Sequence, residues 1–419
     1  MSSVNPPSSS SSSSLSTSSP PGLVFILLLG FLVGLSPFAI DMYLSSFLAI
    51  ESDLSASQYA VESSVGVYLV FFALPQLFFG PLSDAYGRRF AVFCGLGCYI
   101  AGAFLCATAQ SIEVFLIARA LQGTGSAAIS VTVPAIVKDR FSGAVYTRTV
   151  GFIMMVMSVA PLIAPMAGTI VFYVGGWRSI FYVLVVLSVI CAVLFRSIIT
   201  ESSSIESRTP LNVKNLFKNY STLFSDRYCL GLAMCVGFML AGLMAFITGS
   251  PFLFMDKYGI SQLSYSVLFG VNVLSMMLFT YVNNRLIHTV SNENLLRAAV
   301  IAVFVASCYL LVLGVWESMG NRPPLAAIII GCVLYIANLG MITANIQVIL
   351  ISRFSHIAGA TSAMVGTLRF GIGSLGGFVY TYLSSAYGLS LSAVMGLCGF
   401  CVLFAYLFAR KPVATNSEP

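Results

Sequence analysis

The stretch LVFILLLGFLVGLSPFAIDMYLSSFLAI, residues 23–50, has a single charged side chain, that of Asp41. A run of about 20 apolar residues is enough for a helix to span the hydrocarbon core of a bilayer, which is about 30 Å thick. Helices of soluble proteins seldom have an apolar run of this length, because one of their faces meets water. The stretch therefore predicts a membrane-spanning helix.

Eleven further apolar runs of similar length follow the first one. Hydrophobic residues make up 58% of the 419 residues and charged residues 8%, against about 45–50% and about 25% in soluble proteins. This composition excludes a cytoplasmic enzyme, a secreted disulfide scaffold and a disordered chain. The absence of strand-period alternation favours helices over a barrel. We predict an all-α polytopic membrane protein with twelve transmembrane helices in two six-helix halves, near residues 23–48, 62–81, 91–109, 114–136, 149–174, 178–198, 229–253, 263–283, 296–316, 324–349, 357–384 and 389–409.

The longest polar connection, 199–228, divides these helices into two groups of six. We expect a first half at 23–198, a second half at 229–410, and a linker between them on the cytoplasmic side. Residues 1–22 are mostly Ser and Pro without the basic region of a secretory signal, so they predict a disordered, uncleaved cytoplasmic tail. Residues 411–419 are expected to form a second cytoplasmic tail.

The 20 lysines and arginines are divided unequally between the two ends of the predicted helices. With both termini in the cytoplasm, fifteen fall on the cytoplasmic side, three on the outer side and two, Arg119 and Arg369, inside helices. This bias follows the positive-inside rule. It explains the net charge of +6 by insertion into the lipid bilayer, and no nucleic-acid partner is expected.

Two ionisable residues at similar depth mark a candidate proton site. At the helical rise, Asp41 lies about 13 Å below the outer end of the first predicted helix, and Arg119 about 9 Å below that of the fourth. Each charge inside a membrane costs about 2.5–3.5 kcal/mol and suggests a function or a partner. The matching depths allow an ion pair between them. Asp41 is then either a proton-binding carboxylate or a permanent structural partner of Arg119.

A third charge, Arg369, falls near the middle of the eleventh predicted helix, and the second half has no acid at that depth. Arg369 is either a cation that faces substrate or an arginine satisfied internally. Internal satisfaction would come from backbone carbonyls or from the side-chain amides of Asn272, Asn338, Asn345 and Gln347. We assign Arg369, Asn345 and Tyr43 to the substrate cavity.

Glu62 opens the second predicted helix near the outer surface. We interpret it as a solvated helix start, where an acid suits the helix dipole. The alternative is a second proton site.

The chain shows no motif for catalysis, metal binding or ATP hydrolysis. The stretches GIGSLG (371–376) and GTGSAA (123–128) match phosphate-loop patterns by letter only, because both lie inside predicted membrane helices and follow no strand. No His, Cys and carboxylate cluster has metal-ligand spacing, and no nucleophile–base set is visible. We expect no enzyme, no catalytic residues, no metal and no cofactor.

The loop after the second predicted helix, GPLSDAYGRRF (80–90), closely resembles the signature of the major facilitator superfamily. The resemblance implies a cytoplasmic latch that breaks and reforms during alternating access. Its members would be Gly80, Asp84, Gly87, Arg88 and Arg89. The corresponding loop of the second half, NNRLIHTVS (283–291), does not keep this pattern.

Two further stretches resemble motifs of this superfamily. ARALQGTGSA (118–127) is similar to the conserved-arginine motif, which implies a role for Arg119 in proton transfer. GFIMMVMSVAPLIAPMAG (151–168) resembles the antiporter motif of drug exporters, with alanines in place of two glycines. Here the motif residues are Gly151, Pro161, Pro165 and Gly168.

Finer similarity points to the Bcr/CflA group of drug:proton antiporters, through stretches such as IDMYL (40–44), APLIAP (160–165) and AGATSAMVGTLRFGIG (358–373). It implies proton-coupled efflux of drugs or other small molecules, driven by the proton gradient, with Asp41 and Arg119 in proton coupling. We expect a monomer in the bacterial inner membrane. The alternative is a transporter of a specific metabolite such as a nucleoside, amino acid or sugar. A membrane sensor without transport is a third interpretation.

Overall fold

The computed structural model describes residues 22–141, 143–201, 221–354 and 358–409, which form helices and no strand. The predicted tails and most of the predicted linker lie outside these residues, so the division of the chain at 199–228 stays a prediction. In chain order the elements are α1 (Leu23–Asp41), η1 (Leu44–Ser46), α2 (Phe47–Asp53), α3 (Gln58–Tyr86), α4 (Arg88–Thr108), α5 (Ile112–Arg140), α6 (Gly143–Ile198), α8 (Arg227–Pro251), η3 (Phe252–Lys257), α9 (Gln262–Leu286), α10 (Asn292–Ser318), α11 (Leu325–Arg353), α12 (Ala358–Tyr387) and α13 (Leu391–Ala409).

Short polar side chains start five of these helices. Each accepts a hydrogen bond from the backbone N–H three residues further on, and so satisfies one of the donors that a helix start leaves free. The caps are Ser57 on α3, Ser111 on α5, Asp226 on α8, Ser261 on α9 and Ser291 on α10. The cap at Ser57 starts α3 four residues before the predicted boundary, which places Glu62 more than one turn inside the helix.

Helix α6 contains two membrane crossings. At Gly175 and Gly176 the backbone leaves helical geometry, with φ of 73° at Gly176, a value that L side chains disfavour. The hydroxyl of Ser179 closes the bend with a hydrogen bond of 3.0 Å to the carbonyl of Val171. Directly after the bend, the indole N–H of Trp177 donates to the carboxylate of Asp53 at 3.2 Å. This joins the bend to the end of α2.

Ten segments of the described chain are long and apolar enough to cross a membrane. One of these ten segments lies in α6, which contains two crossings, so the ten segments contain eleven helices. The 30-residue α12 is the twelfth. This confirms the twelve predicted transmembrane helices.

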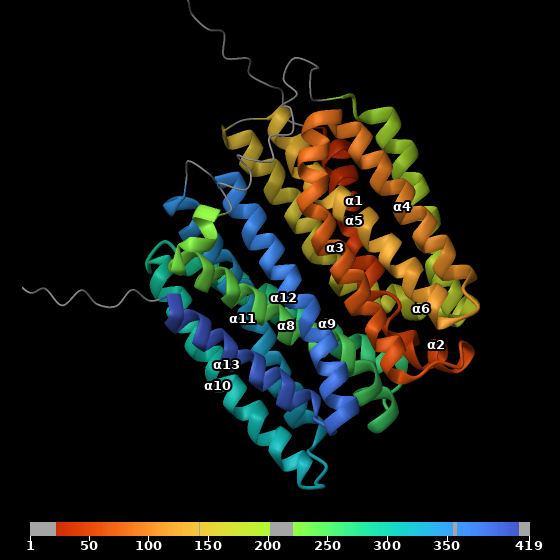
Figure 1. Ribbon diagram of the computed structural model, residues 1–419, viewed down its shortest axis with the longest axis vertical. Helices are drawn as coiled ribbons and strands as arrows, with labels where there is room; N and C mark the ends of the chain where they lie inside the picture. Colours follow the sequence, from red (N-terminus) through yellow and green to blue (C-terminus); the bar gives the residue numbers. More distant parts are fainter. Residues whose placement is uncertain (1–21, 142, 202–220, 355–357, 410–419) are drawn as a thin grey trace, which may run out of the picture.

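The helices form two bundles (Figure 1). Helices α1 and α3 to α6 pack on one another in the first half, and α8 to α13 do so in the second. We call the end of the molecule at Ile198 and Arg227, next to the predicted linker, the linker end. The two halves diverge toward this end in Figure 1, and they meet at the opposite end, which we call the closed end.

The contacts between the halves form two seams, one between α3 and α12 and one between α6 and α9. In the first seam the rings of Phe72 and Phe370 meet edge to face at 4.8 Å. In the second, the hydroxyl of Ser266 donates to the carbonyl of Pro165 at 3.2 Å. Across the tip of the closed end, the rings of Phe47 and Phe252 lie 5.9 Å apart.

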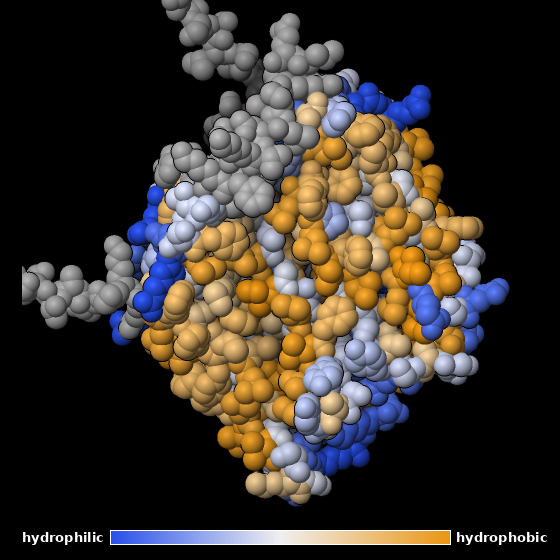
Figure 2. Space-filling model, in the orientation of Figure 1, coloured by the Kyte–Doolittle hydropathy of each residue, from blue (hydrophilic) through white to orange (hydrophobic). Residues whose placement is uncertain are grey.

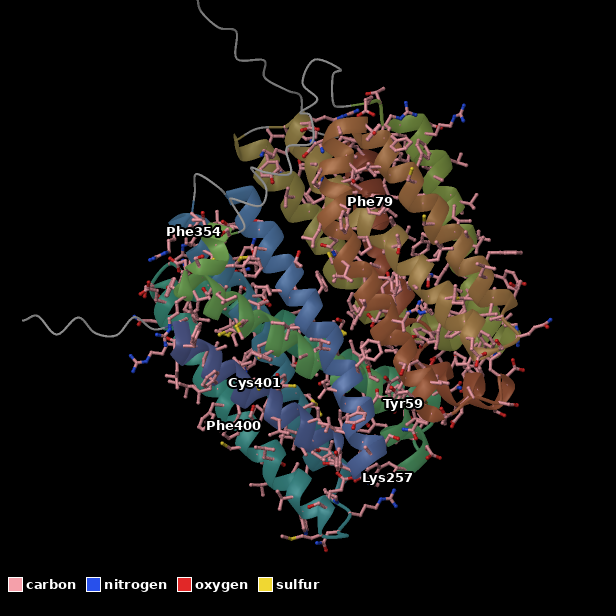
Figure 3. The ribbon with its side chains drawn as sticks, in the orientation of Figure 1. Tyr59, Phe79, Lys257, Phe354, Phe400 and Cys401 are labelled. Atoms are coloured by element: carbon pink, nitrogen blue, oxygen red, sulfur yellow. The ribbon has the colours of Figure 1, made fainter. Side chains whose placement is uncertain are left out.

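The outer surface is apolar over most of the face in view, with hydrophilic residues gathered toward its edges (Figure 2). Figure 3 locates the two ends by labelled side chains: Tyr59 and Lys257 lie at the closed end, and Phe79 and Phe354 lie toward the linker end. A broad apolar girdle between polar ends is the surface expected of a bilayer protein, because lipid tails solvate apolar side chains.

Candidate functional site

Arg119, on α5, is fully buried and is held by neutral groups. Its Nη1 donates to the carbonyl of Ala39 at 2.9 Å and to the amide oxygen of Gln122 at 2.6 Å. The guanidinium also lies 4.5 Å from the ring centres of Tyr43 and of Tyr68. Tyr43 lies in the turn between α1 and η1, and Tyr68 lies on α3. Cation–π contacts of this kind are strongest where water is excluded. These contacts stabilise a buried cation without a carboxylate.

Asp41 is the last residue of α1 and is 4% exposed. Among the described residues no ion pair joins it to Arg119, so the predicted pair is not formed in this structure. The predicted depth is right, since Arg119 bonds to Ala39, two residues before Asp41. The sequence left open whether the two side chains touch, and here Arg119 bonds to the backbone of α1 rather than to the Asp41 carboxylate. Asp41 instead acts electrostatically on the hydroxyls of Tyr68 and, from the second half, Tyr265.

A hydroxyl network surrounds the two tyrosines that sandwich Arg119. Tyr43 bonds to Ser64 at 2.8 Å, and Tyr68 donates to Ser126 at 2.6 Å and to Ser36 at 3.1 Å. Tyr43 is 1% exposed in this conformation, and its assignment to the substrate cavity stays a prediction. Its role is to support Arg119, and through Ser64 it links α1 to α3.

Arg369 lies half-buried on α12 and has no acidic partner within the described chain. Its buried Nε has no hydrogen-bond partner, and its guanidinium lies 5.3 Å from the ring of Phe370. The side-chain amide nitrogens of Asn272, Asn338, Asn345 and Gln347 donate to Leu268, Leu334, Asn283 and Ser362, and no hydrogen bond recorded for the described residues joins these amides to Arg369. Arg369 therefore keeps donors for a ligand.

Asn345 is also 1% exposed, and its assignment to the substrate cavity likewise stays a prediction. Its amide nitrogen donates to Asn283 at 2.7 Å and to the carbonyl of Met341 at 2.8 Å. These bonds tie α11 to α9 inside the second half.

An apolar hollow of about 320 Å³ lies between α1 and α6, on the stretch of α1 that leads to Asp41. It is lined by Gly30, Phe31, Gly34, Phe38, Met155, Val159, Ala160 and Ile163. Cavities of this size and composition suit part of a drug-sized apolar molecule. Phe38, one helical turn before Asp41, brings this surface close to the carboxylate.

The antiporter-motif residues divide into those that α1 contacts and those that it does not. A side-chain carbon at Gly168 would collide with the carbonyl of Met42, the residue after Asp41. A side-chain carbon at Gly151 would meet nothing within 4 Å. Pro161 lies beside Ala160 of the apolar hollow, and Pro165 offers its carbonyl to Ser266 of α9. Pro165 and Gly168 therefore hold α6 against the second half and against the chain that follows Asp41.

The predicted latch forms a network at the linker end of the first half. Arg88 is ion-paired with Asp84 and, at 2.9 Å, with Asp139. The backbone N–H groups of Arg88 and Arg89 donate to the carboxylate of Glu201. Gly87, with φ of 104°, makes the turn between α3 and α4.

Gly80, the first residue of the latch motif, has open space where a side chain would be in this conformation. The partners recorded for the latch within the described chain belong to the first half, except Glu201, which falls in the predicted linker.

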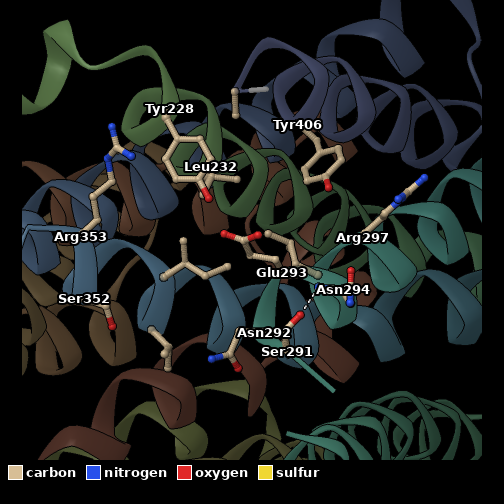
Figure 4. A pocket seen from close by; sticks show the side chains of 14 residues that line it. Tyr228, Leu232, Ser291, Asn292, Glu293, Asn294, Arg297, Ser352, Arg353 and Tyr406 are labelled. Carbon is tan, nitrogen blue, oxygen red and sulfur yellow. Dashed lines mark hydrogen bonds between the residues drawn. The ribbon is translucent and has the colours of Figure 1, made fainter. Parts of the chain in front are cut away.

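A second cavity, of about 840 Å³, opens at the linker end of the second half (Figure 4). Glu293 lies among Tyr228, Arg297 and Arg353 in its lining, and Arg353 is paired with Asp226 at 3.1 Å. Burial by itself would raise the pKa of Asp226, but the backbone N–H of Cys229 and the Arg353 guanidinium outweigh it and hold the pKa below its usual value. With both charge signs present, this cavity shows no preference for an anion or a cation.

No group of three or more metal-ligating side chains occurs in the part of the chain that the structure describes. The ionisable residues considered for transport are single ones: Asp41, Glu62 and Arg119, which are buried, and Arg369, which is half-buried. Of these, sequence reasoning misjudged Glu62, which is 2% exposed and not a solvated helix start.

Comparison with known proteins agrees with this architecture. The model of the Major Facilitator Superfamily matches residues 26–377. An uncharacterized MFS-type transporter, YdgK, of Bacillus subtilis is 33% identical over 84% of this chain and 87% of its own length. A bicyclomycin resistance protein homolog of Haemophilus influenzae is 29% identical over 92% and 96%, and multidrug resistance protein D of Escherichia coli is 26% identical over 94% and 98%. The crystal structure of a D-xylose–proton symporter superposes with a TM-score of 0.73 at 14% identity, over 92% of this chain and 98% of that one.

Proposed function

The chain belongs to the major facilitator superfamily, and on that premise we propose that it exports drugs or other small molecules in exchange for protons. The observation that carries the proposal is Asp41, a buried carboxylate without an ion-pair partner in the described chain, which acts on groups of both halves. A carboxylate in such a place gains or loses a proton according to whether water reaches it. The relatives named for bicyclomycin and multidrug resistance support export over uptake.

The proposed orientation places the linker end and both termini in the cytoplasm of a bacterial cell, with the protein in the inner membrane. The distribution of Lys and Arg supports it through the positive-inside rule. In this orientation the closed end, where the two halves meet, faces outward.

The proposed cycle uses the two seams as alternating barriers. In the outward-open state Asp41 takes up a proton and the exported molecule leaves. After the seams close and the linker end opens, Asp41 loses the proton to the cytoplasm. Substrate then binds with its apolar part in the hollow between α1 and α6. Arg119 does not neutralise Asp41 directly. It fixes Ala39 and Tyr43, on either side of Asp41, and thereby holds the carboxylate in place.

Transport of a specific anionic metabolite is the second candidate function. Arg369 favours it, because a guanidinium with free donors and no acidic partner in the described chain matches a carboxylate or phosphate.

Proteoliposomes with an acidified lumen test the proposal. A panel of drugs and metabolites is added outside, and proton efflux is recorded for the wild type, for Asp41→Asn, and for Asp256→Asn, which removes an exposed carboxylate. We expect substrate-triggered efflux in the wild type and in Asp256→Asn, and none in Asp41→Asn. Efflux that persists in Asp41→Asn would move the proton site elsewhere. No efflux with any compound, from folded protein, would favour transport without protons.

A further inference from the structure

Glu62 is a buried carboxylate in the barrier between the two halves. It lies on α3, more than one turn from the Ser57 cap, and is 2% exposed. Gln58, one turn earlier, donates to its Oε1 at 2.7 Å. The hydroxyl of Thr381 approaches the carboxylate from α12 in the second half. Glu62 is therefore covered by the second half only while the closed end is closed.

The two seams differ in chemistry at this level. The seam between α6 and α9 is joined by neutral hydroxyls: Thr169 bonds to Ser45 at 3.0 Å and to Ser266 at 2.8 Å. The seam between α3 and α12 contains the Glu62 carboxylate, with Gly66 one turn further packed against the ring of Phe378. Of the described residues named in these two seams, Glu62 is the one with an ionisable carboxylate.

The groups around Glu62 do not neutralise a negative charge. Tyr380, beside Thr381 on α12, and Glu51, on α2, are the other titratable groups that interact with it. No cation of the described chain lies within ion-pair distance of Glu62.

The other helices that pack on α3 supply no cation to Glu62 either. On α5, Arg119 is held by Ala39 and Gln122. On α4, Arg88 and Arg89 are at the linker end. On α8, Arg227 is also at that end. An unpaired buried carboxylate costs several kcal/mol in its charged form, so closure favours the neutral acid.

We propose that Glu62 is a second proton-binding site, which takes up a proton when the closed end closes and returns it to the same side when the closed end opens. The inference rests on the proposed function for its orientation, in which that side is the outside of the cell. Protons bind the closed state more tightly than the open one, so external acid stabilises closure. Because the proton leaves on the side from which it came, Glu62 adds nothing to the number of protons exchanged per substrate.

Hydrogen exchange of the full chain in lipid nanodiscs tests this site. Backbone exchange of residues 58–70 and 376–387 is followed over about two pH units around neutrality and corrected for the intrinsic pH dependence of exchange. In the wild type we expect opening to increase with pH, by at most about tenfold per unit for one proton. In Glu62→Gln we expect slow exchange at every pH, because the neutral amide mimics the protonated acid.

Two variants serve as controls. Glu62→Asp keeps the carboxylate and should keep the pH response. Glu113→Gln removes an exposed acid near the same end and should behave as the wild type. Retention of the pH response in Glu62→Gln would overturn the proposal.

The proton-to-substrate ratio, measured in the proteoliposomes described above, separates this inference from the proposed function. If Glu62→Gln exchanges as many protons per substrate as the wild type, the proton of Glu62 returns to the side from which it came. If the variant exchanges one proton fewer, Glu62 carries a proton across the membrane and the proposal is overturned. Wild-type liposomes can show no substrate-driven proton flux while the pH response of hydrogen exchange still depends on Glu62. In that case the proposed function is contradicted and the proton site at Glu62 is supported. If flux depends on Asp41 but the exchange response does not depend on Glu62, the site fails alone.

Discussion

The two halves share a fold but not a charge pattern. Among the described residues expected inside the membrane, the first half contains Asp41, Glu62 and Arg119, each buried, whereas the second half contains Arg369. Buried amides of the second half bond within that half: Asn345 donates to Asn283, and Asn272 and Asn338 donate to backbone carbonyls. A fold built from similar halves can therefore divide its work: proton chemistry in one half, and recognition of a substrate charge in the other.

The loops at the linker end repeat this contrast. In the first half, Arg88 is shared by Asp84 and Asp139. At the corresponding position of the second half, Arg285 bonds only to the hydroxyl of Tyr281, its own neighbour one turn earlier, among the contacts recorded for the described chain. Ionic contacts thus join α3, α4 and α5 at this end of the first half.

The largest expected effect separates energy coupling from transport. Asp41→Asn should reduce export against a gradient to background, because the site can no longer release a proton. It should retain exchange of labelled for unlabelled substrate, which needs no net proton movement. Counterflow and uphill export, measured in the same vesicles, check this. Loss of both counterflow and uphill export would mean that Asp41 also binds substrate. It would then contradict the separation of proton chemistry in the first half from substrate recognition in the second.

The next effect concerns the arginine of the first half. Arg119→Lys keeps the charge but loses the two-sided stacking on Tyr43 and Tyr68 and at least one of its hydrogen bonds. We expect the free energy of unfolding to fall by about 2–4 kcal/mol. Arg285→Lys, at an exposed site of the second half, is the matched control, with a change of under about 0.5 kcal/mol. Thermal unfolding in detergent measures both, and equal effects would contradict the burial of Arg119 as the cause.

A pair of glycines in the antiporter motif gives an effect of intermediate size. Gly168→Ala should displace the chain at Met42 and cost about 1–3 kcal/mol of stability, while Gly151→Ala should cost nothing measurable. If Gly168→Ala also lowers proton-coupled export more than its stability loss explains, the close contact positions Asp41. Equal behaviour of the two variants would show that α6 adapts to either side chain.

Arg369→Gln should weaken transport of anionic substrates by about tenfold in KM, the loss of one charge-assisted contact. The proton-to-substrate ratio should stay the same, and neutral substrates should be unaffected. Transport assays with one anionic and one neutral substrate distinguish these results. A changed ratio would assign Arg369 to proton coupling and would remove the proposed division between the halves.

The smallest effect lies at the linker end of the second half. The pKa of Asp226 is lowered in the folded state, so its stabilising contribution is present above the unfolded-state pKa and is lost as the pH falls. Because the pair with Arg353 is partly exposed, Asp226→Asn should cost less than about 1 kcal/mol. The difference in unfolding temperature between the two proteins should shrink in acid. A constant difference would mean that the ion pair with Arg353 is not its cause, because asparagine keeps the helix cap at Cys229.

The sequence predicted the helices, the latch and the depth of the charges, because these depend on composition and spacing along the chain. It did not predict which way side chains face. Arg119 reaches the level of Asp41 but contacts Ala39, and Asn345 turns to Asn283 inside its own half. Glu62 was misjudged because the hydrophobic run begins there, whereas the helix begins at Gln58, after the Ser57 cap. Orientation depends on neighbours that are distant in sequence, and a single sequence does not show them.

The bend after Gly175 gives the protein an optical reporter of its own. The chain has two tryptophans, one in each half. Trp177 is 5% exposed and bonded to Asp53, while Trp316 is 44% exposed. A water-soluble collisional quencher will therefore extinguish the emission of Trp316 first and leave a shielded component from Trp177. Opening of the closed end is expected to disturb the contact between the bend and α2, so the shielded fraction should follow the transport cycle in real time without any added label.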